Sequence, residues 1–499
     1  MTSLALHEGA EQAARRFGDR TAILAGDEEW SFRRVDTAAS SFAARLASQG
    51  VIAGDRVAVL MGNRPEFIAA VYGISKLGAA SVLFSPAWKD REIDHALGLT
   101  APVHAVVEES TAPALAGRLG LSDVDDPDTS SISRPAVAPA QVVPESDAVL
   151  VFSSGTTGLP KAVRHTHFSM GRATAHWCAA LGLGPDDRFQ VATPPSHILG
   201  LLNLLAATAA GASVRLHRRF DLDESLRRIS SERMTLEMAV APIALAMANH
   251  PDLESYDLSS LRYIMWGATP ITESVAETVT RRTGVQWLPA YGASELPVLS
   301  ANPADRPDRW RLDSAGLPPT EVELRVVELD SGDALESGGV GEIQARSPSV
   351  MAGYLPEEAN DDAFADGWYR TGDVGWLEPE GWVHLTDRCK EMIKVKGFQV
   401  APAEIEAVLH GHRSVVDCAV FGVPDEQSGE LPVAVVQLDP ASPVAVDQLK
   451  DLVANSLAGY KQLSEVVVAD AIPRLGSGKV LRRTLRDEWL SGRERENQL

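Results

Sequence analysis

The chain has few cysteines and no recognisable export signal. Its three cysteines, Cys178, Cys389 and Cys418, lie far apart and are odd in number. This excludes a disulfide framework, and the spacing matches no zinc site. A reducing cytoplasm is the simplest location. The first residues lack a basic segment followed by an apolar core, so no secretory signal is expected.

Long apolar runs are also lacking. The stretch 189–214 contains no Asp, Glu, Lys or Arg and is the one segment that suggests a membrane span. It is interrupted by Pro194, Pro195, His197, Gly200 and Asn203. Its clean apolar part is shorter than the about 20 residues that a span needs. We therefore predict a buried helix over 199–210 and no integral membrane segment.

Basic residues are fewer than acidic residues. The chain has 499 residues, with 46 Lys and Arg against 68 Asp and Glu, and a formal net charge of -22. A nucleic-acid-binding protein usually carries a basic face, so DNA and RNA are excluded as partners. A hydrophobic content of 45% is that of an ordinary globular protein, and the length indicates more than one domain.

Strand-like and helical segments alternate up to about residue 314, which predicts an α/β fold. Helices are expected over 65–78, 199–210, 223–233 and 271–284. Shorter strands follow, over 321–328, 341–347 and 382–386, and indicate a small β-rich part. Helices over 404–410 and 444–458, with strands between them, predict a compact α+β unit at the end of the chain.

The segment Ser153–Lys161 holds two Ser, two Thr, two Gly and a Lys within nine positions, directly after a buried run. Its N–H and hydroxyl donors are closely spaced, and its glycines let the backbone approach an anion. This predicts a cradle for nucleotide phosphates. It is not the ordinary ATPase loop, because Pro160 precedes Lys161 and Ala162 follows it.

The order Ser-Ser-Gly-Thr-Thr-Gly-Leu-Pro-Lys resembles the signature loop of the adenylate-forming (AMP-binding) enzymes. These include acyl-CoA synthetases, coumarate–CoA ligases, beetle luciferases and peptide-synthetase adenylation domains. Further motifs of the family follow in the family's order: Trp266-Gly-Ala-Thr-Pro270, Tyr291-Gly-Ala-Ser-Glu295, Tyr369-Arg-Thr-Gly-Asp373, Asp387–Glu406 and Ile472–Lys479. The resemblance covers roughly residues 10 to 490.

The resemblance implies a set of nucleotide-binding residues: Ser153, Ser154, Gly155, Thr156, Thr157, Gly158, Lys161, Gly267, Ala268, Tyr291, Gly292, Ser294, Asp373 and Arg388. Tyr291 would stack on adenine, and Asp373 would accept hydrogen bonds from the ribose hydroxyls. A carboxylate suits that role because it offers two acceptor oxygens and no donor. Thr156 and Glu295 would hold Mg²⁺, together with phosphate oxygens.

The acyl pocket is expected at His197, Trp266 and Gly267. In the family, a residue at the position of His197 closes behind the substrate carboxylate; the alternative is a hydrogen-bonded core histidine. Trp266 either shortens the pocket or is a core aromatic. An apolar acid, fatty or aromatic, is expected.

The resemblance also divides the chain into an N-terminal adenylation domain, 1–389, and a small mobile C-terminal domain, 390–499. Lys390 falls at the hinge. Lys479 would act in the first step, on the carboxylate and the phosphoryl oxygens. Lys394 would face the site in the thioester step. Apolar residues alternate with the lysines around it, which predicts that one face of this segment is buried.

The expected reaction joins a carboxylic acid to a thiol in two steps, through acyl-AMP and with release of pyrophosphate. The thiol is expected to be coenzyme A. The first alternative is a phosphopantetheinyl carrier protein supplied in trans. An alternative of another class is a nucleotide-binding protein without catalytic activity.

Overall fold

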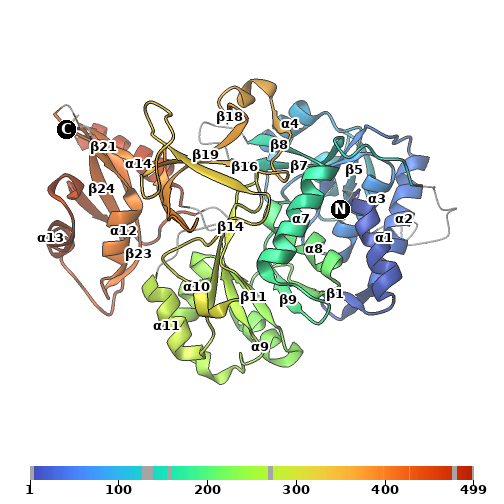
Figure 1. The fold of residues 1–499 in the computed structure, drawn as a ribbon, viewed down its shortest axis with the longest axis horizontal. Coiled ribbons are helices and arrows are strands. Elements are labelled where there is room, and N and C mark those ends of the chain that lie inside the picture. The colour runs from blue at the N-terminus through green and yellow to red at the C-terminus, as the bar shows by residue number, and fades with distance from the viewer. Residues whose placement is uncertain are drawn as a thin grey trace.

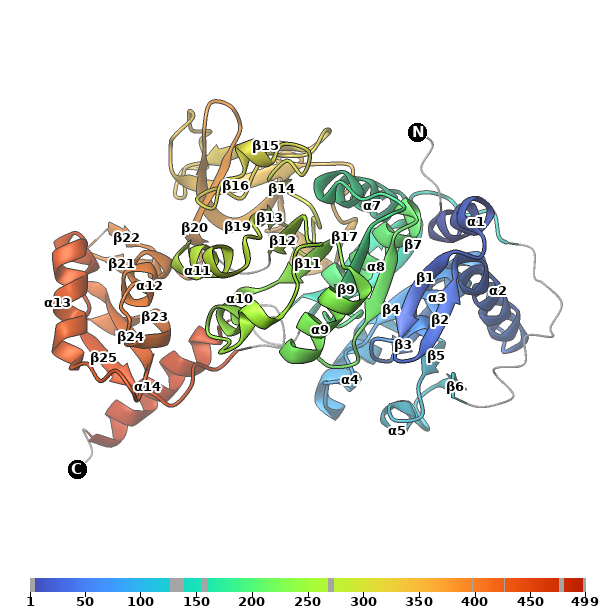
Figure 2. The same ribbon diagram turned by 90° about the horizontal axis from the view of Figure 1, so that it is seen from below.

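The computed structural model describes residues 5–125, 139–153, 160–267, 273–396, 398–425, 427–474 and 480–496. The described strands form four sheets. Three belong to the larger N-terminal part, and the fourth is built by residues from 393 onward. Figure 1 and Figure 2 both show this last part, orange to red, as a separate body at one end of the molecule. The predicted α/β class, with a large N-terminal part and a small C-terminal α+β unit, is confirmed.

A seven-stranded sheet carries the predicted phosphate-binding segment. Its order is β17-β8-β7-β4-β3-β5-β6. In chain order its strands are β3 (Arg56–Leu60), β4 (Ala80–Leu83), β5 (His104–Val107), β6 (Gly120–Asp123), β7 (Asp147–Ser153), β8 (Lys161–Thr166) and β17 (Gly353–Leu355). Strands β3 to β7 are parallel, whereas β8 and β17 are added antiparallel at one edge.

An eight-stranded sheet, in the order β14-β13-β12-β11-β9-β10-β1-β2, lies beside it. Its strands are β1 (Thr21–Ala25), β2 (Glu28–Ser31), β9 (Arg188–Val191), β10 (Ser213–Leu216), β11 (Leu236–Ala239), β12 (Tyr263–Trp266), β13 (Trp287–Tyr291) and β14 (Ser300–Ala301). All pairings are parallel except those of β2 and β14 at the two edges.

One apolar core joins the two sheets through the helices that pack between them. These are α1 (Leu6–Phe17), α2 (Phe32–Ser48), α3 (Pro65–Lys76), α7 (His167–Leu181) and α8 (Ile198–Ala210). The outer face of the eight-stranded sheet is covered by α9 (Leu222–Glu232), α10 (Ala241–Ala248) and α11 (Glu273–Thr283). The outer face of the seven-stranded sheet is covered by α4 (Asp90–Thr100) and α5 (Ala112–Leu115).

The remaining sheets follow in the chain. The β-rich part contains β15 (Glu323–Val327), β16 (Gly341–Arg346), β18 (Phe364–Ala365), β19 (Trp368–Leu377) and β20 (Val383–Arg388). The C-terminal sheet contains β21 (Ile393–Val395), β22 (Phe398–Val400), β23 (Val415–Asp425), β24 (Gly429–Leu438) and β25 (Glu465–Val468). It is accompanied by α12 (Pro402–His410), α13 (Val446–Ser456) and α14 (Arg482–Glu496).

The predicted helix over 199–210 is α8, which starts one residue earlier and stops at Gly211, where φ is +79°. A left-handed glycine is a common end for a helix because it has no Cβ to clash. Of the helices in the described ranges, none combines the length and the apolarity that a bilayer crossing requires. The apolar stretch is therefore core, as predicted.

A row of polar side chains is buried between the eight-stranded sheet and α9. The Gln190 amide donates to Glu237 Oε2 at 2.7 Å and accepts from His217 Nε2 at 2.6 Å. Burial raises the pKa of Glu237 to about 7. The protonated carboxyl is therefore favoured in the folded chain, and raising the pH forces a charge into a site that water does not reach.

Glu237→Gln should remove a pH-dependent loss of stability. Because the folded pKa lies above the unfolded value, the wild type should lose stability as pH rises from about 4.5 to about 7, by about 3 kcal/mol. The variant should lack this loss and be the more stable protein at pH 8. Denaturant unfolding across this range tests it, with the exposed Glu145→Gln as control. Parallel curves for Glu237→Gln and wild type would contradict the assignment.

Candidate active site

The two ends of the predicted phosphate loop lie side by side. Ser153 ends β7 and pairs with Lys161, which begins β8. The predicted contacts Ser154, Gly155, Thr156, Thr157 and Gly158 lie outside the described residues, as do Ala268 and Lys479. The described end of the loop is tied to α4, because the His95 imidazole donates from Nε2 to the Pro160 carbonyl at 2.9 Å.

Lys161 and Glu295, predicted to bind phosphate and metal, are joined by a tyrosine that no sequence motif singled out. Tyr354 lies on β17, directly beside β8. Its hydroxyl donates to Glu295 Oε1 at 2.8 Å, and Lys161 Nζ lies 5.0 Å from the centre of its ring. Burial and the Glu295 charge raise the pKa of Tyr354, so the hydroxyl remains a donor. Only the pairing of β17 with β8 brings these three residues together.

A second group surrounds Asp373 on β19. The Tyr291 hydroxyl donates to Asp373 Oδ2 at 2.5 Å, and Arg388 Nε lies 3.0 Å from Oδ1. Asp373 and Arg388 are direct neighbours across the β19–β20 ladder. The carboxylate raises the pKa of the Arg388 guanidinium. Asp373 is thus held by an aromatic donor and a cation from separate strands.

The two groups are connected by the segment 291–295, because Tyr291 bonds Asp373 and Glu295 bonds Tyr354. Tyr369 of β19 is a buried residue of the same region. Burial raises the pKa of this phenol, and the charges of Glu295 and Asp373 raise it further. The side chains predicted for phosphate, metal and ribose therefore face one region. An arrangement with Asp373 and the Lys161 end of the loop on different sides of the molecule is excluded.

The turn after Tyr291 is tightly closed. A Cβ on Gly292 would come within 2.1 Å of the Pro297 carbonyl oxygen, so only glycine fits there. Ala293 N–H donates to the Leu296 carbonyl at 3.0 Å. The closed turn fixes the path of the chain from Tyr291, which bonds Asp373, to Glu295, which bonds Tyr354.

His197 caps the start of α8. Its Nδ1 accepts the Leu199 N–H at 3.2 Å, and burial lowers its pKa. The neutral ring therefore carries its proton on Nε2. An Nε2–H donor fits both a hydrogen-bonded core histidine and a residue of the acyl pocket. The acyl-pocket role of His197 therefore stays a prediction.

Trp266 ends β12 and is almost fully buried. Its ring packs against Trp287 with centroids 5.0 Å apart, in the cluster beneath α10 and α11. This packing agrees with the core-aromatic alternative. The adjacent Gly267 lies beside Met265, whose Sδ would be 3.2 Å from an added Cβ. The predicted contribution of both residues to an acyl pocket remains untested.

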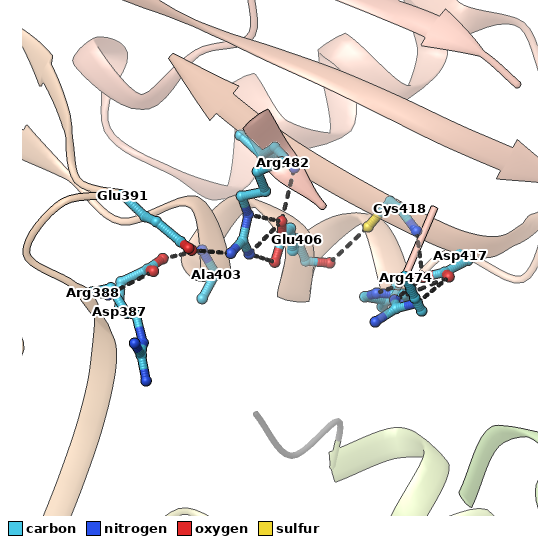
Figure 3. Close-up of polar contacts among 11 residues, drawn as sticks. Asp387, Arg388, Glu391, Ala403, Glu406, Asp417, Cys418, Arg474 and Arg482 are labelled. Carbon is cyan, nitrogen blue, oxygen red and sulfur yellow. Dashed lines mark hydrogen bonds and ion pairs between the residues drawn. The ribbon is translucent and has the colours of Figure 1, made fainter. Parts of the chain in front are cut away.

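Lys390 lies between β20 and β21, where the two parts of the chain meet. Before it, Asp387 Oδ2 accepts the Ala403 N–H at 2.9 Å from the start of α12, and burial raises the Asp387 pKa to about 6. After it, Arg482 of α14 pairs with Glu391 and with both oxygens of Glu406, as Figure 3 shows. The predicted hinge is thus flanked by polar contacts on both sides.

Lys394 is exposed on β21 between the buried residues Ile393 and Val395. The predicted burial of one face of this segment is confirmed. Ile393 and Val395 belong to the core of the C-terminal sheet. The strand therefore presents Lys394 on its outer face.

The described residues contain no group of three or more His, Cys, Asp or Glu that could cage a metal ion. Mg²⁺ usually takes one or two carboxylates and completes its shell with water and phosphate oxygens. Glu295 fits that pattern, because Tyr354 occupies only one of its oxygens. Within the described ranges, Oε2 accepts no hydrogen bond.

Comparison with known proteins agrees with this geometry. Residues 10–355 match the AMP-binding enzyme family, and residues 404–479 match the AMP-binding enzyme C-terminal domain. The chain is 34% identical over 513 residues to 4-coumarate–CoA ligase 5 of Oryza sativa subsp. japonica, covering 98% of this chain and 95% of that protein.

Two solved structures are similar over their whole length. ATP-bound MatB from Rhodopseudomonas palustris superposes with a TM-score of 0.90 at 25% identity, over 97% of this chain and 99% of that chain. The o-succinylbenzoate CoA synthetase of Bacillus subtilis, in complex with its acyl-adenylate intermediate, gives 0.86 at 29% identity, over 97% and 99%.

Tyr291→Phe should destabilise the fold by about 1–3 kcal/mol, because a buried carboxylate loses a donor that water cannot replace. The matched control is Tyr256→Phe, which removes a tyrosine–carboxylate bond of 3.1 Å to Asp223 at the surface. Water can replace that bond, so little change is expected there. Unfolding in urea compares the two variants, and equal losses would show that burial of the Asp373 pair is unimportant.

Proposed function

This chain belongs to the AMP-binding enzyme family, and its full-length relatives include acid–CoA ligases; from that premise we propose that it activates a carboxylic acid with ATP and transfers the acyl group to coenzyme A. The observation that carries the proposal is the convergence of Lys161, Glu295 and Asp373 on one region from three separate sheets. One region with a cation, an acidic metal ligand and a buried carboxylate suits a nucleoside triphosphate.

In the first step, a carboxylate oxygen attacks the α-phosphorus and the bond to pyrophosphate breaks. The acyl group then carries AMP as its leaving group, whereas hydroxide would leave poorly at neutral pH. Negative charge builds up on the phosphoryl oxygens in the transition state, and cations placed there lower its free energy. Lys161 and, by resemblance, Lys479 supply them.

Asp373 and Tyr291 would hold the nucleoside. A carboxylate offers two acceptor oxygens for the ribose hydroxyls, and Arg388 and Tyr291 keep the Asp373 carboxylate in place. Glu295 would hold Mg²⁺ beside the phosphates. When bound, the ion neutralises charge on the phosphate oxygens.

In the second step, a thiol attacks the acyl-adenylate and AMP leaves. Rotation of residues 390–499 about Lys390 would replace Lys479 with the β21 segment that carries Lys394. Asp387 and Ala403 lie on opposite sides of Lys390, so their contact would change with the rotation. A conformational change of this kind lets one pocket serve two transition states.

The proposed acid is apolar. His197 offers one neutral donor, and Leu296 and Trp266 are buried apolar residues near the Tyr291 turn and β12. The relatives named above act on coumarate and o-succinylbenzoate, so aromatic acids are the first substrates to test, with fatty acids second.

A panel of aromatic and fatty acids, incubated with the purified chain, MgATP and CoA, tests this function. Mass spectrometry of acyl-CoA and acyl-AMP, with a pyrophosphate assay, separates the candidates. Carboxylate-dependent pyrophosphate release with acyl-CoA formation is the expected result. Acyl-AMP without acyl-CoA would favour a carrier-protein acceptor. ATP binding without pyrophosphate release for any acid would favour the inactive nucleotide-binding protein.

Lys479→Ala should reduce acyl-AMP formation about 10²–10³-fold, by analogy with the loss of one oxyanion donor. Thioester formation from supplied acyl-AMP should change far less. Lys394→Ala is the matched variant and should show the opposite bias. Single-turnover assays of each half-reaction measure both. Equal losses in the two steps would remove the assignment of Lys479.

A further inference from the structure

A histidine lies between the phosphate-binding strand and the turn that carries Glu295. His165 is the fifth residue of β8, which begins at Lys161, and its side chain is fully buried. Nε2 lies 2.7 Å from the backbone oxygen of Ser294, and Nδ1 lies 3.3 Å from Ser169 Oγ. The imidazole therefore bridges β8 of one sheet to the turn after β13 of the other.

The direction of both hydrogen bonds follows from the chemistry of the partners. A carbonyl oxygen only accepts, so Nε2 carries the proton. Burial lowers the pKa of His165 to about 4, so the ring is neutral and Nδ1 is an acceptor for the Ser169 hydroxyl. Ser169 in turn accepts the Thr166 N–H at 3.0 Å in the cap of α7. These hydrogen bonds fix the orientation of the His165 ring, and the ring itself stays uncharged.

The turn is held at other points besides this one. The Glu295 carbonyl accepts the Met351 N–H at 2.8 Å, and its carboxylate accepts the Tyr354 hydroxyl. Both of these donors lie on or just before β17. The His165 imidazole is the contact to this turn that comes from β8. It donates to the carbonyl of Ser294, the residue immediately before Glu295. Loss of this tie would leave the backbone of Ser294 free to move relative to Lys161.

A purely structural role would be to satisfy one buried carbonyl. The chain offers a comparison, because His176 on α7 is also buried and its Nδ1 lies 3.2 Å from Ser349 Oγ. Ser349 in turn bonds Ser347, so the side-chain bonds of this pair lie away from Ser294 and Lys161. Replacing His176 therefore reports the cost of removing a buried imidazole in general.

We propose that His165 is a positioning residue: through the Ser294 carbonyl it holds the Glu295 carboxylate at the distance from Lys161 that a metal–triphosphate complex requires. This inference rests on the proposed function, since it assigns Glu295 to the metal. Residues that orient a metal ligand typically change metal affinity by about 10–100-fold when they are removed.

The test is calorimetric titration of ATP, once with excess Mg²⁺ and once with EDTA. His165→Asn is the loss variant, because its amide stops short of the Nε2 position. His165→Gln is the rescue, because its longer amide can still donate to Ser294. His176→Asn is the matched control. His165→Asn should weaken MgATP binding about 10-fold and leave metal-free ATP binding within about threefold, whereas the other two variants should match wild type.

A double variant completes the test. If His165 acts through Glu295, His165→Asn should add no further loss of MgATP affinity in a Glu295→Gln background. Equal weakening with and without Mg²⁺, additive losses in the double variant, or an effect no larger than that of His176→Asn would each overturn the proposal. The proposal would also be overturned if wild type bound ATP with the same affinity in Mg²⁺ and in EDTA. Failure of wild type to bind ATP at all would instead remove the proposed function.

Discussion

The hydroxyl of Tyr354, bonded to the Glu295 carboxylate, is the contact on which the arrangement of the site depends. Tyr354 belongs to the edge of the seven-stranded sheet, and Glu295 follows a strand of the eight-stranded sheet. Each sheet by itself carries only part of the site. Close-packed helices between them set the spacing of the sheets, and packed interiors deform little. The polar contacts across the junction therefore have a fixed geometry on which a ligand can rely.

The distribution of charge at this junction follows from burial. Lys161 lies against an aromatic ring, and Arg388 lies against Asp373, so both cations of the proposed site already have partners within the chain. His197 and His165 are kept neutral by burial and supply directed N–H donors without adding charge. The cations and neutral donors named here are therefore each held by a specific contact.

Polar contacts also surround the connection between the two parts of the chain. Asp387 accepts a hydrogen bond from the start of α12, and Arg482 of α14 forms ion pairs with Glu391 and Glu406. The Asp387–Ala403 bond spans Lys390, whereas Arg482, Glu391 and Glu406 all lie on the C-terminal side of Lys390 and hold that part of the chain together.

The family and several of the helices were determined by the sequence alone, because local residue patterns indicate them. The order of glycine-rich and acidic motifs identified the family, and the apolar stretch 199–210 predicted a buried helix that is α8. The helix expected over 223–233 is α9, and the Asp221 carboxylate caps it by accepting the Glu224 N–H. Helices such as α7 and α10 were not predicted, since α10 is apolar on nearly every side and shows no amphipathic stripe. Only the tertiary structure decided that Tyr354 and His165 join the site. Their contacts with Glu295 and Ser294 span 59 and 129 residues, and such distant pairs depend on how two sheets dock rather than on any local signal.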